Sequence, residues 1–361
     1  MSRSSERVMQ IRQHVRYTTA SDGARLAWAE AGSGAPIVKA ANWLTHLEYE
    51  WASPLWKHWL QYFSGIGRLV RYDERGCGLS DWNRVPLTLD QWVEDLDSVI
   101  EAARPAGPVT LLGISQGAAT CISYAVRRPE RVARLVLYGG YAHGAAHRGT
   151  PADQAAYRAM IDLARAAWDR ENSSFRQVFT SRFIPGASAG QLAWFNDLCR
   201  KCSTGEVVAE LLQARSTVDV SGLLGQVRVP TLVLHARGDE VIPVSEGRLL
   251  AASIPGAEFV ELDSRNHVLL EHEHAWSRFT DAVSAFVGGS RDADSPFGAL
   301  SAREREVLAA IAEGLRNAEI AERLNISEKT VRNHATVVFE KLGVTSRAQA
   351  IVFARDRHFG G

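Results

Sequence analysis

The sequence carries no excess of charge and little cysteine. Its 41 Lys and Arg residues balance 41 Asp and Glu residues, so no overall field draws the chain to nucleic acid or membrane, and any such surface must be local. The four cysteines (Cys77, Cys121, Cys199, Cys202) are too few and too irregularly spaced for a disulfide framework. Cys199 and Cys202 have C-x-x-C spacing, but no second ligand pair and no thioredoxin-like pattern accompanies them. We therefore expect two thiols on one face of a helix, and neither a metal nor a cofactor.

The sequence also lacks a long apolar run. No stretch is long enough to span a bilayer, and the polar N-terminus lacks the apolar core of a secretory signal. These absences predict a cytoplasmic chain with no membrane partner. The 46% of hydrophobic and 23% of charged residues are typical of a folded protein and exclude a disordered or collagen-like chain. A length of 361 residues suggests two domains of unequal size.

The clearest break in composition lies at residues 288–297, which are rich in Gly, Ser, Asp and Pro. Such a segment is typical of a linker. It follows an amphipathic helical stretch that ends at Phe286. We therefore predict a first domain over residues 15–287 and a second over residues 298–361.

The first domain alternates short β-branched runs with helical patterns, which predicts an α/β fold with a mostly parallel sheet covered by helices on both faces. The segment at residues 144–221 interrupts this alternation with a helical, aromatic-rich pattern. We expect it to form a lid over the carboxyl edge of the sheet. The expected strands lie at residues 36–38, 68–72, 109–112, 132–138, 231–234 and 258–262, and two of the expected helices at residues 90–103 and 116–127.

A serine stands between an expected strand and an expected helix, in the sequence Gly113-Ile114-Ser115-Gln116-Gly117. Small residues on both sides permit the sharp, strained turn that exposes a nucleophilic hydroxyl at a helix amino end. Residues 73–80 add the pattern D-x-R-G-x-G-x-S, which we interpret as structural. With these two elements, the first domain resembles the α/β-hydrolase fold.

The resemblance implies a catalytic triad in the chain order serine, acid, histidine. Asp239 follows the expected strand at residues 231–234, and His267 follows the strand at residues 258–262. Ser115 would attack a carbonyl, His267 would accept and return its proton, and Asp239 would orient the imidazole. Asp263 is a less favoured alternative for the acid, because it is expected to be a solvated loop residue.

The expected oxyanion loop, residues 39–46, departs from the family pattern because it lacks glycines that would turn its amides toward the oxyanion. Donors must come from the amide of Gln116 and from the region of Asn42 and Trp43. Losing one oxyanion donor costs roughly 2.7–4 kcal/mol of transition-state stabilisation. The sequence therefore leaves open whether the domain is an enzyme, and favours ligand binding with weak or no turnover.

After the linker, four short helical patterns follow one another. Ser301 and Glu304 form a capping box for the first, Ser327 caps the third, and Gly343 ends it. Residues 300–354 contain the patterns S-x-R-E-x-E-V-L, G-L-x-N-x-E-I-A, I-S-x-x-T-V-R-x-H and K-L-G-V-x-x-R. This segment resembles the LuxR-type (FixJ- or NarL-type) helix-turn-helix domain, which implies double-stranded DNA as a partner.

By position in that family, one set of residues on the third helix is expected to face bases, and another to hold phosphates. Basic charge gathers on the third helix and its exit, whereas the acids of the other helices are expected to form solvated faces. The fourth helix, with Ala350, Ile351 and Ala354, is expected to form a homodimer. The base-facing set is Arg332, Asn333 and Thr336; the phosphate set is Lys329, Thr330, His334 and Lys341; the solvated acids are Glu304, Glu306, Glu313 and Glu322.

Two functions remain open at this point. The first is a DNA-binding transcription regulator whose hydrolase-like domain senses a small-molecule ligand of the ester, lactone or amide type. The alternative is an active serine hydrolase, an esterase or lactonase, that also binds DNA. The specificity of the helix-turn-helix pattern favours the first. No receiver domain precedes this pattern, so a two-component response regulator is not expected.

Overall fold

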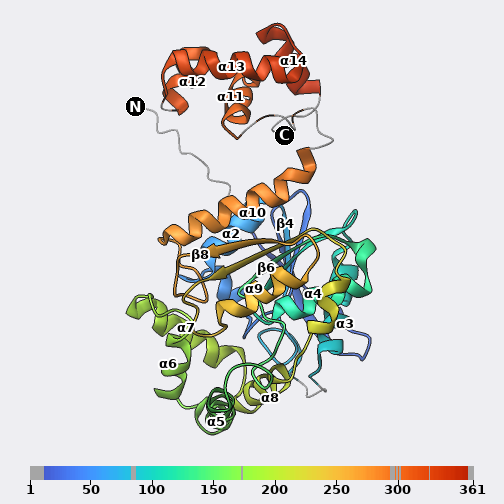
Figure 1. Ribbon diagram of the computed structural model, residues 1–361, viewed down its shortest axis with the longest axis vertical. Helices are drawn as coiled ribbons and strands as arrows, with labels where there is room; N and C mark the ends of the chain where they lie inside the picture. Colours follow the sequence, from blue (N-terminus) through green and yellow to red (C-terminus); the bar gives the residue numbers. More distant parts are fainter. Residues whose placement is uncertain are drawn as a thin grey trace. The chain divides into compact units, whose positions relative to one another are not determined.

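The chain forms two compact units, residues 1–283 and residues 284–361. The computed structural model shown in Figure 1 describes residues 12–82, 87–171, 174–292, 297, 300, 302–324 and 326–356. Each unit has its own elements and core, and each is described separately below.

The described part of the first unit contains one eight-stranded sheet in the order β1-β2-β4-β3-β5-β6-β7-β8. The strands from β4 to β8 in this order run parallel, whereas β1 and β2 pair antiparallel at one edge. This confirms the predicted α/β fold, to which the structure adds the antiparallel edge. The strands are β1 (His14–Thr19), β2 (Arg25–Ala31), β3 (Pro36–Lys39), β4 (Arg68–Tyr72), β5 (Val109–Ile114), β6 (Val132–Tyr138), β7 (Thr231–Ala236) and β8 (Glu258–Leu262).

Helices cover both faces of the sheet. Figure 1 shows α2 (Lys57–Ile66) and α10 (His274–Asp292) on one face, and α4 (Gly117–Arg127) and α9 (Val244–Ser253) on the other. Aromatic rings join α2, α10 and β6, with the Trp59 ring centroid 4.7 Å from Phe279 and 5.2 Å from Tyr138. Edge and tilted ring packing of this kind stabilises a core beyond the area that it buries. Further elements are α1 (Leu47–Trp51), α3 (Leu89–Ala103) and the 3-10 helices η1 (Pro129–Arg131) and η2 (Ser221–Gln226).

Four helices lie between β6 and β7 in the chain, within the segment expected to form the lid. They are α5 (Pro151–Ala167), α6 (Ser174–Ser181), α7 (Ala189–Cys202) and α8 (Gly205–Ser216), drawn in green to yellow in Figure 1. Thr150 and Ser188 begin α5 and α7 with capping boxes. Cys199 and Cys202 on α7 are buried and form no disulfide, and burial raises the pKa of both thiols.

Helix α10 ends later than the sequence predicts. The expectation that this helix stops at Phe286 is wrong, because α10 continues to Asp292 and so includes the first residues of the expected linker. Each glycine lowers helix propensity by about 1 kcal/mol but does not forbid the helical backbone. Residues 293–296, the rest of the expected linker before Phe297, lie outside the described residues. In the described part of the chain no helix is long and apolar enough to cross a membrane.

After the end of α10, the described part of the second unit contains four short helices, drawn in orange to red in Figure 1. They are α11 (Ala302–Ala312), α12 (Asn317–Leu324), α13 (Glu328–Leu342) and α14 (Arg347–Asp356). Ser327 caps α13 by accepting from the backbone N–H of Thr330 (3.1 Å), and Gly343 ends it in the left-handed region at φ 67°. The core includes Val307, Leu308, Ile311, Ile320, Val331, Val338, Ala350 and Ala354.

Two expectations for the second unit are wrong. Ala350 and Ala354 have no exposed surface within this unit, because α14 packs them into the core of the domain, so they are not available to a dimer interface. Glu304 is also buried rather than solvated, and its carboxylate binds Lys341 Nζ at 2.7 Å. Both differences arise from contacts between helices, which the pattern of a single helix does not show.

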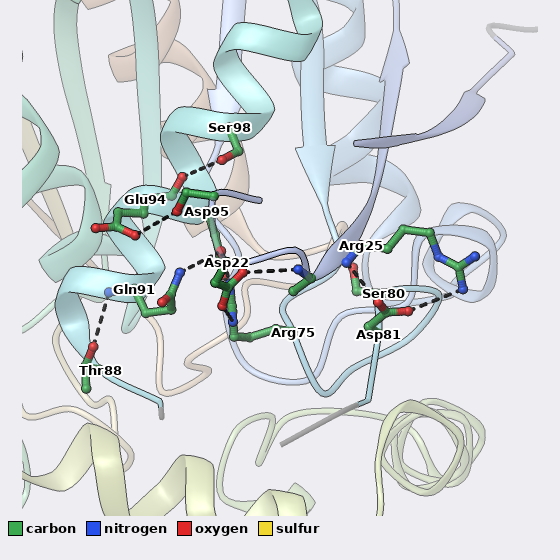
Figure 2. Close-up of polar contacts among 12 residues, drawn as sticks. Asp22, Arg25, Arg75, Ser80, Asp81, Thr88, Gln91, Glu94, Asp95 and Ser98 are labelled. Atoms are coloured by element: carbon green, nitrogen blue, oxygen red, sulfur yellow. Dashed lines mark hydrogen bonds and ion pairs between the residues drawn. The ribbon is translucent and has the colours of Figure 1, made fainter. Parts of the chain in front are cut away.

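The loop that follows β4 is structural, as expected. Arg75 Nε donates to Asp95 Oδ2 on α3 at 2.7 Å, and Arg75 Nη1 donates to Asp22 Oδ2 at 2.7 Å (Figure 2). Ser80 Oγ in the same loop accepts from the backbone N–H of Ala27 on β2. The loop therefore joins the edge strands to α3.

We predict that Asp95→Ala destabilises the first unit by about 3–5 kcal/mol, because it leaves the buried Arg75 guanidinium without its main partner. Both side chains are 1% exposed. All ten tryptophans precede residue 284, so urea unfolding followed by tryptophan fluorescence reports on this unit. Asp90→Ala on the same helix is the control: the Asp90 side chain is 72% exposed, and its loss should cost less than about 1 kcal/mol. Equal losses in the two variants would contradict the prediction.

Candidate functional site

Ser115 occupies a strained turn between β5 and α4. Its φ of 54° lies in the left-handed region, and its backbone N–H donates to the carbonyl of Tyr138 at the end of β6 (2.8 Å). A Cβ atom at position 113 would lie 2.7 Å from Ala118 Cα, and one at position 117 would lie 3.1 Å from the Ala41 carbonyl oxygen. Glycine at both positions therefore allows the close packing that the turn requires.

Asp239 and His267 come together at the carboxyl edge of the sheet. His267 Nδ1 lies 2.6 Å from Asp239 Oδ2, and Asp239 Oδ1 accepts from the backbone N–H groups of Val241 (2.8 Å) and Ile242 (2.9 Å). Burial acts to raise the pKa of Asp239, but the charge and hydrogen bond of His267 outweigh it and leave the pKa below its ordinary value. An ionised Asp239 can therefore orient the imidazole, as the triad requires.

A second histidine lies beside Asp239, whereas the alternative acid, Asp263, does not. Sequence reasoning missed His235, whose Nε2 lies 3.7 Å from Asp239 Oδ2 and 2.9 Å from the carbonyl oxygen of Ile242. Burial lowers the pKa of His235, which favours a neutral ring beside the Asp239–His267 pair. Its position four residues before Asp239, at the end of β7, was the available signal. Asp263 has a side chain that is 87% exposed and pairs with Arg237, so it lies away from the imidazole.

The hydroxyl of Ser115 faces the Gln116 side chain, whose amide nitrogen and oxygen fit their surroundings when they are exchanged. When the Gln116 amide is oriented to satisfy its neighbours, its nitrogen donates to Ser115 Oγ at 2.8 Å. Its oxygen accepts from Arg215 Nη1 at 2.5 Å and from the backbone N–H of Trp43. Among the described residues, His267 Nε2 has no hydrogen-bond partner. The Gln116 side chain therefore binds the Ser115 hydroxyl, which a hydrolase uses as its nucleophile, and the Trp43 N–H, which is an expected oxyanion donor.

The expected oxyanion donors are only partly available. The backbone N–H of Trp43 is bound to Gln116, and Asn42 Oδ1 accepts from the buried Nζ of Lys39. Burial lowers the pKa of Lys39 to about 8. Leu44, in the same loop, has a φ of 45°, which is strained for a residue with a side chain. Such a loop presents a poor oxyanion hole unless the Gln116 side chain moves.

The buried Arg215 of α8 connects this site to the structural loop after β4. Its guanidinium binds both carboxylate oxygens of Glu74, in addition to the Gln116 amide. All of these atoms lie in a buried region, where hydrogen bonds to charged groups are strong and their loss is costly. The chain Glu74–Arg215–Gln116 thus joins the lid helix α8 to Ser115.

A cavity lies next to Ser115, between the tight turn at Ser115, here called the elbow, and the helices that follow β6. Ser115 and Gln116 form part of its lining. Trp43, Phe179, Phe183 and Leu212 give it an apolar wall, and three arginines give it positive charge. The ring of Phe183 also packs on His267, with centroids 5.4 Å apart. The arginines are Arg148, Arg182 and Arg215.

Helix α13 divides into a buried and an exposed face. Val331, Ala335, Val338 and Leu342 are buried in the domain core. Four of the expected DNA-contacting residues lie on the exposed face at spacings of three and four: Lys329, Arg332, Asn333 and Thr336. Thr330 and His334 are half-buried, and Lys341 is held by Glu304. The structure therefore presents one polar, basic stripe of the helix to solvent.

The two parts of the chain that carry these sites match two families of known proteins. The profile of the family described as serine aminopeptidase, S33, matches residues 53–274, which is more than half of the chain. The chain belongs to this family. The profile of the bacterial regulatory proteins of the luxR family matches residues 298–354. The chain is thus a LuxR-type DNA-binding regulator domain fused to an S33 α/β-hydrolase domain.

Individual proteins resemble one part or the other. The probable transcriptional regulatory protein SgaR of Hyphomicrobium methylovorum is 32% identical over 148 residues, which are 41% of this chain and 53% of SgaR. Pyrrolizixenacetamide deacetylase of Xenorhabdus hominickii is 25% identical over 226 residues, which are 60% of this chain and 80% of that protein. A hydrolase structure from Pseudomonas aeruginosa PA01 has a TM-score of 0.64 at 26% identity, and the match covers 76% of this chain and 98% of that one. The chain spans about half the length of SgaR.

Within the described residues, no group of three or more His, Cys, Asp or Glu side chains could hold a metal ion.

We predict that Gln116→Ala raises the reactivity of Ser115. The change releases Ser115 Oγ and the backbone N–H of Trp43, and one oxyanion donor is worth roughly 10²–10³ in rate. The rate of labelling by a fluorophosphonate, measured by mass spectrometry of the intact protein, should rise about tenfold or more.

Two controls accompany this variant. Gln226→Ala removes an exposed glutamine that is not part of the cavity lining, and it should label like the wild type. Ser115→Ala combined with Gln116→Ala should not label at all. Labelling of Gln116→Ala at the wild-type rate would show that the glutamine does not restrain Ser115.

Proposed function

We propose that this protein is a ligand-responsive transcription regulator. Its S33 domain binds a small ester-, lactone- or amide-like molecule with weak or no turnover, and its LuxR-type domain binds double-stranded DNA. The observation that carries the proposal is the side chain of Gln116, which binds both Ser115 Oγ and the Trp43 N–H. A DNA-bound regulator of this kind acts in the cytoplasm.

A carbonyl ligand at this site would compete with Gln116. Its oxygen would take the N–H groups of Trp43 and Gln116, and Gln116 would release Arg215 as it moves. Because Arg215 belongs to the lid helix α8, the lid would then repack. Ligand binding would thus change the lid through the chain Glu74–Arg215–Gln116, which provides the differential contacts that any response to a ligand needs.

The second candidate is an active hydrolase that also binds DNA. The pair Asp239–His267 favours it, because the acid is ionised and correctly placed and His267 Nε2 is unoccupied among the described residues. The relative from Xenorhabdus hominickii is named a deacetylase, which is consistent with amide or ester chemistry in this fold. This candidate requires Gln116 to leave the site as the substrate enters.

The DNA-binding part of the proposal uses the exposed stripe of α13. Arg332, Asn333 and Thr336 would contact base edges in the major groove, and Lys329 would contact phosphate. A homodimer on an inverted repeat remains part of the proposal, because paired recognition helices read two half-sites. In the unit itself, Val352 on α14 is 57% exposed and is available to such an interface.

We predict different losses for two variants of α13. Arg332→Ala should cost roughly 1–3 kcal/mol on the cognate site and relax sequence preference, because it removes a base contact. Lys329→Ala should weaken binding to all sequences alike. It should also reduce the slope of log K against log salt concentration by about one. Fluorescence anisotropy over a salt series measures both effects.

The control is Arg323→Ala. Arg323 lies on α12 instead of α13, and it is exposed and pairs with Glu313. This variant should bind DNA like the wild type. If the two α13 variants also bind like the wild type, α13 is not the recognition helix.

We predict that Ser115→Ala separates ligand response from catalysis. Without ligand, its DNA affinity should stay within about twofold of the wild type, because only one hydroxyl is lost. A thermal-shift screen of esters, lactones and amides identifies a ligand, and a gel shift with the full-length protein then tests whether that ligand changes DNA binding. A receptor responds in the wild type and in Ser115→Ala, with affinities that differ by about one hydrogen bond. Rapid hydrolysis of several short esters that depends on Ser115 would instead support the enzyme.

A further inference from the structure

The charges that line the cavity above Ser115 are all positive. Arg148, Arg182 and Arg215 belong to its lining, which includes neither Asp nor Glu. Arg215 is neutralised by Glu74. Among the described residues, Arg148 and Arg182 have no carboxylate partner, so their charges are left for an incoming group.

The two arginines are held in place without being neutralised. Arg148 Nη1 donates to the His143 carbonyl oxygen at 3.0 Å, and its guanidinium lies 4.8 Å from the centroid of the Tyr141 ring. Arg182 Nη2 donates to the Glu240 carbonyl oxygen at 2.9 Å. Each guanidinium therefore donates one N–H group to a backbone oxygen. Its other N–H groups lie in the same plane and remain available to a ligand.

Acidic residues in the hollow next to the cavity are already engaged. Asp153 caps α5 through Thr150, and Glu240 binds Arg265 at 2.6 Å. Glu246 accepts from the backbone N–H groups of Ala142 (2.8 Å) and His143 (3.0 Å). None of these carboxylates forms an ion pair with Arg148 or Arg182 among the described residues.

From this arrangement we infer that the ligand of the S33 domain carries a carboxylate besides its ester, lactone or amide carbonyl. The inference rests on the proposed function and adds the class of ligand. Arg148 and Arg182 bind the carboxylate, whose two planar oxygens match the N–H edge of a guanidinium, while the carbonyl replaces Gln116 at Ser115. The aromatic residues Phe179, Phe183 and Tyr157, which also line the cavity, contact the carbon skeleton between the two groups.

Two phenyl esters with acyl chains of six carbons test the inference: monophenyl adipate, which carries a carboxylate, and phenyl hexanoate, which does not. Binding is measured by isothermal titration calorimetry to full-length Ser115→Ala protein, so that neither probe is hydrolysed. We expect monophenyl adipate to bind about tenfold or more tightly than phenyl hexanoate, and the preference to shrink as salt is added.

Substitution of the arginines should remove this preference. In Arg148→Gln combined with Arg182→Gln, the two probes should bind within about twofold of each other, because the affinity for monophenyl adipate falls and that for phenyl hexanoate does not. The control is Arg228→Gln, an exposed arginine that, like Arg182, donates to backbone carbonyls and lies outside the cavity lining. It removes the same charge and should leave the preference intact.

The outcomes separate this inference from the proposed function. Equal binding of the two probes to Ser115→Ala protein, binding of neither, or a preference that survives the double substitution would each overturn the inference. A preference for monophenyl adipate that depends on both arginines would support it, even if the probe leaves DNA binding unchanged. In that case the carboxylate site stands, and the proposal that ligand binding controls DNA binding fails.

Discussion

The tight turn at Ser115 is the constraint on which the rest of the site depends. The positive φ of Ser115 and the absence of side chains at Gly113 and Gly117 let three segments approach closely: β5, the start of α4 and the loop after β3. A Cβ atom at either glycine would push α4 or that loop away. The same approach places the Gln116 amide against the backbone of Trp43, so the elbow determines both the strain and the hydrogen bonds of the site.

Buried charge gives this site its coupling to the lid. Arg215 is neutralised by Glu74 and also donates to Gln116. A movement of the Gln116 side chain would therefore change the hydrogen bonds of Arg215 on α8. A buried ion pair does not stabilise a fold strongly in net terms, but an unpaired member of such a pair is very costly. The chain Glu74–Arg215–Gln116 is therefore better suited to favour one of two arrangements than to add stability.

Each domain uses one element for two purposes. In the S33 domain, Gln116 begins the helix behind the nucleophile and also occupies the groups that would bind a substrate. In the LuxR-type domain, α13 buries Val331 and Val338 in the core and presents Arg332 and Asn333 to solvent. The helical period of 3.6 residues separates the two faces of α13, so the core residues and the solvent-facing polar residues occupy different positions.

The sequence by itself determined the features that depend on neighbouring residues. Alternating strand and helix patterns predicted the α/β sheet, small residues around Ser115 predicted the turn, and Ser327 and Gly343 predicted the ends of α13. These features follow from backbone sterics, capping and periodicity, each of which acts over a few residues. The same local rules failed at α10, where two glycines lower helix propensity without ending the helix.

Only the tertiary structure decided which distant side chains meet. It placed Gln116 between Trp43 and Arg215, set His235 beside Asp239, and tied Lys341 to the buried Glu304. It also left Arg148 and Arg182 without carboxylate partners among the described residues beside the cavity. No local pattern specifies these pairings, because each depends on how the lid, the loops and the helices pack over segments that lie far apart in the chain.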